Sequence, residues 1–132
     1  MDRRTWLSLC VGVLSGGCLG RGPPKKQIAW IRLKNNRGEA RTIEIFIERN
    51  GEEVFRGNYR LDSNPKQATI RVDDPVEKPG RYSLYVDTGN QLLAIQPGEF
   101  ADVDMGVSCI GIQCTLHEQG TTGFAFEPVQ AC

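Results

Sequence analysis

Residues 43–61 read IEIFIERNGEEVFRGNYRL, and this stretch indicates the fold class. Isoleucine alternates with glutamate or phenylalanine in its first five residues, which is the pattern of a β-strand with one buried face. Asn50-Gly51 follows, and both residues tolerate the positive φ angles that a type I′ turn requires. The stretch therefore predicts a β-hairpin that pairs Ile43–Arg49 with Glu53–Leu61.

The same two-residue period continues on both sides of this hairpin. Short runs rich in β-branched and aromatic residues alternate with turn sequences such as Asp62-Ser63-Asn64-Pro65. About seven to nine short strands predict an all-β chain, folded as an antiparallel β-sandwich, with a small β-barrel as the competing architecture. The predicted strands are residues 29–33, 43–49, 53–61, 68–72, 82–86, 91–96, 101–107, 110–116 and 123–127.

The first residues are predicted to lie outside this sandwich. Arg3-Arg4 precede an apolar stretch that ends at Leu14, and small residues follow before Cys18. A basic start, a short apolar core and small residues are the three parts of an export signal. The apolar run has about nine residues, well below the roughly 20 that a membrane-spanning helix needs. Residues 1–17 are therefore predicted to form a signal peptide.

Three short motifs resemble those of a known class of exported protein. Arg3-Arg4 resembles the twin-arginine motif of signals that carry folded cargo, and Leu14-Ser15-Gly16-Gly17-Cys18 resembles a lipobox. With Leu19-Gly20, this junction resembles that of small lipoproteins of halophilic archaea. Pro79-Gly80 followed by Tyr82 resembles the start of a strand in many Ig-like and fibronectin-like domains. The resemblance implies an archaeal lipoprotein with an Ig-like β-sandwich.

The same resemblance implies where the protein resides. Cys18 would carry two lipid chains, which suffice for stable anchoring at the extracytoplasmic face of the cell membrane. Residues 18–26 are polar and stiffened by Pro23-Pro24, so they are predicted to be the lipidated tether. Residues 27–132 would then be the β-sandwich domain, attached to the membrane through the lipid.

Three cysteines remain in the predicted domain. A hairpin centred near Gln119 would place Cys109 opposite a residue near 130, close to Cys132. Continuous strand would separate the Cα atoms of Cys109 and Cys114 by roughly 16 Å, whereas a disulfide tolerates less than about 7 Å. We therefore predict a Cys109–Cys132 disulfide, with Cys114 as a buried free thiol.

The cysteines also allow a second interpretation. Cys109, Cys114, Cys132 and His117 are ligand types that suit zinc or copper, so a metal-binding or redox module is the alternative function. Their spacing lacks the short Cys-x-x-Cys pair of specific zinc motifs. The disulfide with a buried thiol is therefore preferred, and no cofactor is expected.

Composition disfavours several classes of function. The chain has 132 residues with 16 basic and 16 acidic side chains, so no strong field marks it as a nucleic-acid binder. It holds a single histidine and neither a phosphate-binding loop nor a nucleophile elbow. We expect a non-enzymatic structural, accessory or binding module with no nucleic-acid partner and no evident small-molecule substrate.

One apolar surface is predicted as a candidate binding patch. Trp30 shares a strand face with Ile28, while Phe46 and Tyr85 are expected on the outward faces of their strands. If these strands are neighbours, the exposed side chains would form a patch for an unidentified protein partner.

Overall fold

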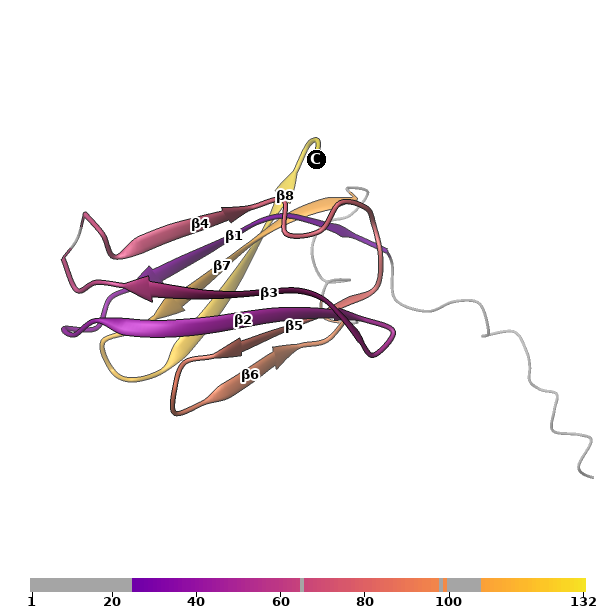
Figure 1. Ribbon diagram of the computed structural model, residues 1–132. Helices are drawn as coiled ribbons and strands as arrows, with labels where there is room; N and C mark the ends of the chain where they lie inside the picture. The colour runs from indigo at the N-terminus through magenta and orange to yellow at the C-terminus, as the bar shows by residue number, and fades with distance from the viewer. Residues whose placement is uncertain (1–24, 65, 98, 100–107) are drawn as a thin grey trace, which may run out of the picture.

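Eight β-strands form two four-stranded sheets that face each other as a β-sandwich (Figure 1). This computed structural model describes residues 25–64, 66–97, 99 and 108–132. No α-helix occurs among them, and so nothing in these ranges is a helix of membrane-spanning length. The predicted sandwich is therefore confirmed. The strands are β1 (Gln27–Asn35), β2 (Arg41–Arg49), β3 (Glu52–Leu61), β4 (Thr69–Asp73), β5 (Tyr82–Asp87), β6 (Leu92–Ile95), β7 (Cys109–Leu116) and β8 (Thr122–Val129).

The connectivity is that of a Greek key with one unusual pairing. One sheet has the order β4-β1-β7-β8 and the other β3-β2-β5-β6. Strands β1 to β6 follow the order of strands B, C, C′, E, F and G of immunoglobulin-like domains, in which B and E share one sheet and C′, C, F and G the other. β7 lies beside β1, in the place of strand A, and runs parallel to it. The other pairings are antiparallel, as predicted.

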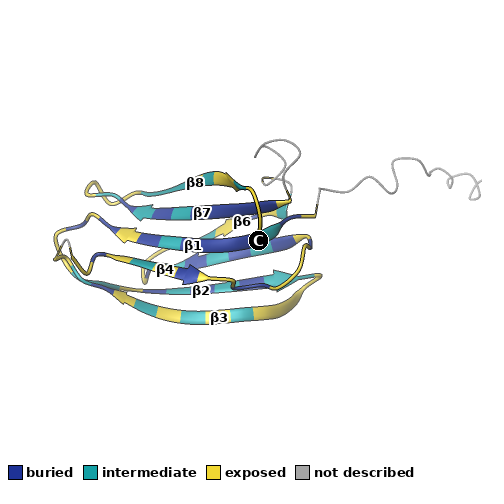
Figure 2. Ribbon diagram, turned by 90° about the horizontal axis from the view of Figure 1, so that it is seen from above, coloured by how far each residue is buried: buried dark blue, intermediate teal, exposed yellow. Residues whose placement is uncertain are grey.

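Alternate side chains of every strand fill the space between the sheets. Ile43, Ile45 and Ile47 of β2 have no exposed surface and face the inward side chains of the opposite sheet. Figure 2 shows the buried positions concentrated in the central strands β1 and β7. Burying one such side chain contributes about 1.5–3 kcal/mol, which makes this layer the main source of stability.

The β2–β3 hairpin has the predicted turn. Asn50 and Gly51 adopt φ angles of 55° and 80°, and β2 pairs antiparallel with β3 from Arg41 opposite Leu61 to Arg49 opposite Glu52. Both positive angles agree with a type I′ turn, whose twist matches that of the flanking strands. The predicted strand at residues 101–107 and the signal segment at residues 1–17 lie outside the described residues.

The side chain of Tyr82 holds the start of β5 against the preceding loop. It is 2% exposed, and its Oη donates a hydrogen bond of 2.6 Å to the carbonyl oxygen of Lys78. A tyrosine at this corner, bonded to the backbone a few residues upstream, is a hallmark of immunoglobulin-like sandwiches. The ring lies against Gly80, where an added Cβ would approach Cζ of the tyrosine to 2.9 Å. The Pro79-Gly80-x-Tyr82 motif thus has a structural role.

Replacing Tyr82 by phenylalanine is expected to lower the free energy of unfolding by about 1 kcal/mol, because the Lys78 carbonyl loses its donor. Urea denaturation of the two proteins measures the difference. Tyr85→Phe is the matched control, since the Tyr85 hydroxyl forms no hydrogen bond within the described residues. Equal losses in both variants would contradict a specific role for the Tyr82 hydroxyl.

Candidate functional site

The predicted patch of Trp30 and Phe46 does not form. The two residues belong to β1 and β2, which lie in different sheets. A β-bulge between Ile28 and Trp30 turns Ile28 into the core, where it has no exposed surface. The prediction is wrong because side-chain alternation reports which residues share a face of one strand, and it does not report which strands are neighbours.

Trp30 is instead covered by its own sheet. The side chain is 7% exposed and lies across Gly111 of β7, where a Cβ would collide with the indole ring. The guanidinium groups of Arg32 and Arg71 lie 4.6 and 5.0 Å from the ring centroid. These cation–π contacts and the missing Cβ explain how a large aromatic side chain fits on the outer face.

Phe46 is engaged in a similar way on the other sheet. Its ring stacks on Tyr85 with 4.8 Å between centroids, and Arg56 lies 4.6 Å above it. Arg56 also forms ion pairs of 2.7 Å with Glu44 and with Glu53. The hydrogen bond from Arg56 lowers the pKa of the Glu53 carboxyl. Charged side chains thus cover the ring that was expected to be free.

The cysteines form the predicted pair. Cys109 at the start of β7 is joined to Cys132 by a disulfide, with 5.8 Å between their Cα atoms. Cys114 is a free thiol inside the sandwich, where burial raises its pKa to about 12. A thiol with that pKa is inert at neutral pH.

The alternative metal site of Cys109, Cys114, Cys132 and His117 is not assembled. Two of its four ligands are joined to each other in the disulfide, and a third is enclosed between the sheets. In the described ranges, no group of three or more His, Cys, Asp or Glu side chains is placed to hold a metal ion. The hypothesis is wrong because the β7–β8 register brings Cys109 close to Cys132. Their sulfurs form a disulfide and are therefore not available as metal ligands.

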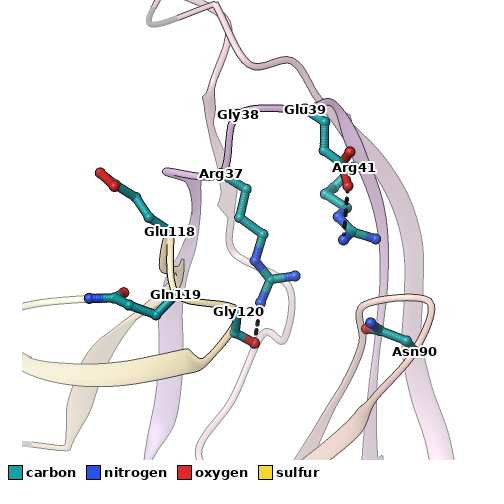
Figure 3. A pocket seen from close by; sticks show the side chains of 8 residues that line it. All are labelled: Arg37, Gly38, Glu39, Arg41, Asn90, Glu118, Gln119 and Gly120. Atoms are coloured by element: carbon teal, nitrogen blue, oxygen red, sulfur yellow. Dashed lines mark hydrogen bonds and ion pairs between the residues drawn. The ribbon is translucent and has the colours of Figure 1, made fainter.

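A polar pocket of about 480 Å³ lies at one end of the sandwich (Figure 3). Three connections meet there, namely β1–β2, β5–β6 and the β7–β8 turn. In the strand correspondence given above, the first two are the B–C and F–G loops, which carry the binding residues of antibody variable domains. The lining residues are Arg37, Gly38, Glu39, Arg41, Asn90, Glu118, Gln119 and Gly120.

Arg37 holds this end together. Only 8% of the residue is exposed. Nε donates to the carbonyl oxygen of His117 at 3.1 Å, and Nη2 donates to those of Gly120 and Thr121 at 2.9 and 3.2 Å. Its backbone N–H donates to the side chain of Asn35 at 3.0 Å. One guanidinium thus fixes the β7–β8 turn against the β1–β2 loop.

Arg41 and Asn90 also line the pocket. Nη2 of Arg41 pairs with a carboxylate oxygen of Glu39 at 3.1 Å, while its buried Nε has no hydrogen-bond partner among the described residues. Oδ1 of Asn90 accepts a hydrogen bond of 3.3 Å from the hydroxyl of Thr88. Figure 3 shows Arg37, Arg41 and Asn90 around one gap, with the carboxylate of Glu118 pointing away from it. The sequence analysis had not singled out any of these residues.

Comparisons with known proteins add little to this picture. No protein-family model matches the chain, and no curated protein matches it. The chain is similar to a solved structure of suilysin, a cytotoxin of Streptococcus suis, at 13% identity and a TM-score of 0.33. The match covers 79% of this chain and 24% of that one, so this chain spans about a quarter of the other's length. A likeness at this level carries no argument about function.

Reduction of the disulfide is expected to lower the free energy of unfolding by about 3 kcal/mol, because the unfolded chain then regains the entropy of a loop that spans 23 residues. Denaturation with and without a reductant measures this change. The Cys132→Ser variant is the control and is expected to respond little to the reductant. If the unmodified chain were equally insensitive, the Cys109–Cys132 bond would be ruled out.

Replacing Arg37 by methionine is expected to lower the free energy of unfolding by about 2–3 kcal/mol, because three carbonyl oxygens lose a charged donor. Amide hydrogen exchange in the β7–β8 turn is expected to accelerate as well. Arg41→Met is the matched control, and its half-exposed ion pair predicts a loss of less than about 1 kcal/mol. Equal losses would show that Arg37 does not act as the clamp of this turn.

Proposed function

We propose that the chain is an extracytoplasmic lipoprotein, anchored in the cell membrane through a lipid on Cys18, whose β-sandwich is a non-enzymatic binding or accessory module. The Cys109–Cys132 disulfide carries the proposal. Structural disulfides persist in oxidising compartments outside the cytosol and are rare within it. The twin-arginine motif at Arg3-Arg4 and the lipobox that ends at Cys18 lie outside the described residues, and their support comes from sequence alone.

The direction of β1 suits a domain tethered at its N-terminal side. β1 begins at Gln27 and runs for nine residues, about 30 Å, before it reaches the loop that contains Arg37. Figure 1 shows the β2–β3 hairpin at the end where β1 begins, and the β5–β6 and β7–β8 turns at the opposite end. A lipid on Cys18 would therefore hold one end near the membrane and leave the pocket facing outward.

The charge at the tethered end fits the same orientation. Six residues lie between Cys18 and Lys25. The seven Cα–Cα steps of an extended tether therefore reach at most about 25 Å. A second pocket of about 370 Å³ at this end is lined by four basic side chains and no acidic one. Basic groups near an anionic lipid surface contribute about 1 kcal/mol each. These side chains are Lys25, Arg49, Lys78 and Arg81.

The anchor is tested by expressing the intact chain and the Cys18→Ser variant in the host. We expect the intact chain in the membrane fraction, with a mature N-terminus at Cys18 that carries the mass of a lipid. Cys18→Ser is expected to leave this fraction or to accumulate as precursor, because the acceptor sulfur is missing. Cys10→Ser, in the predicted signal peptide, is the control and should remain anchored. An unprocessed, water-soluble intact chain would refute the proposal.

A further inference from the structure

We propose that the pocket between the β1–β2, β5–β6 and β7–β8 connections binds a carboxylate group of a ligand, held between the guanidinium groups of Arg37 and Arg41. The inference identifies the chemical class of ligand that the binding module takes. It rests on the proposed function only for the extracytoplasmic location of that module.

Arg37 presents a buried charge without a counter-ion in the part of the chain that the structure describes. The residue is 8% exposed, and each acceptor of its guanidinium hydrogen bonds is a neutral backbone carbonyl. Within the described ranges no carboxylate pairs with it. A buried charge is costly unless an opposite charge compensates it. An anion in the pocket would supply that compensation.

The remaining donor of Arg37 is accessible from the pocket. Nη1 makes no hydrogen bond to any described residue, and it is not among the buried atoms that lack a partner. It therefore has solvent access, and Figure 3 shows this nitrogen directed into the gap toward Arg41 and Asn90. The bonds of Nε and Nη2 to the β7–β8 turn hold it in this direction before a ligand arrives.

Arg41 and Asn90 offer further donors around the same gap. Nη2 of Arg41 is held by Glu39, which leaves Nη1 for a ligand. Oδ1 of Asn90 accepts from Thr88, so its amide nitrogen remains available as a donor. Charge-assisted hydrogen bonds from guanidinium groups to carboxylates are among the strongest that a surface site can form.

The number of free donors and the charge of the lining favour a carboxylate over a phosphate. Arg37 and Arg41 each offer one terminal nitrogen, which matches the two oxygens of a carboxylate. Glu39 and Glu118 also line the pocket, but Glu39 pairs with Arg41 and Glu118 points away from the gap (Figure 3), so neither is seen to pair with Arg37 in the part of the chain that the structure describes. Like-charge repulsion from these glutamates is larger for a phosphate dianion than for a carboxylate monoanion. At about 480 Å³, the pocket also has room for the small group that bears the carboxylate.

The test is an NMR titration of ¹⁵N-labelled full-length chain carrying Cys18→Ser, at constant ionic strength. The probes are acetate, glutarate, acetamide and inorganic phosphate. We expect saturable shifts of the Asn90, Gly120 and Thr121 amides with acetate and glutarate, at least tenfold weaker binding of phosphate, and no saturable shift with acetamide.

Arg41→Gln is expected to raise the dissociation constant for glutarate at least tenfold, and it leaves the Arg37 bonds to the β7–β8 turn in place. Arg71→Gln is the control because Arg71 pairs with Asp73 on the outer face of β4, away from the pocket. It should leave the dissociation constant unchanged.

Shifts that do not saturate, or a dissociation constant unchanged by Arg41→Gln, would overturn the site. Tighter binding of phosphate would overturn the choice of carboxylate. Because the titration uses an unlipidated chain, its failure leaves the Cys18 anchor intact, and failure of the anchor experiment leaves the titration result unaffected.

Discussion

Each strand buries one apolar face between the two sheets, and this burial determines where polar and charged side chains can lie. Side chains alternate across a strand, so a strand that turns Ile43, Ile45 and Ile47 inward must present Glu44 and Phe46 outward. The outer faces are consequently occupied by charged residues that cover the few aromatic rings there. Polar side chains from both sheets can converge without entering the core at the ends of the sandwich. The Arg37 pocket lies at such an end.

Features encoded by neighbouring residues were predictable from the sequence. The β2–β3 hairpin follows from local alternation and from two residues that tolerate positive φ. The disulfide was predictable because the turn near Gln119 fixes which residues of the two flanking strands lie opposite each other. Cys109 lies opposite Val129, one residue from the expected partner position, and Cys132 is still within reach. Short-range counting succeeds because a hairpin's register is set by its turn.

Features that depend on distant pairing were not predictable in the same way. The parallel pairing of β1 with β7 joins segments about 80 residues apart. The alternation of apolar and polar side chains is the same for either direction of a strand, so it does not indicate parallel pairing. The bulge that buries Ile28 depends on that pairing. Arg37 lies in Asn35-Asn36-Arg37-Gly38, which has the composition of an ordinary turn. Its partners are backbone carbonyls of another turn, which leave no signature in residue type.

The two ends of the sandwich are held by different means, and this difference bears on function. The disulfide lies beside the start of β1, where Cys109 is opposite Gln27, so this end is closed covalently. The far end is closed by hydrogen bonds from Arg37 to the β7–β8 turn. Because the same guanidinium directs Nη1 into the pocket, an anion bound there would also strengthen the clamp on the turn. Binding of the proposed ligand and order of the loops at this end would thus be coupled through one side chain.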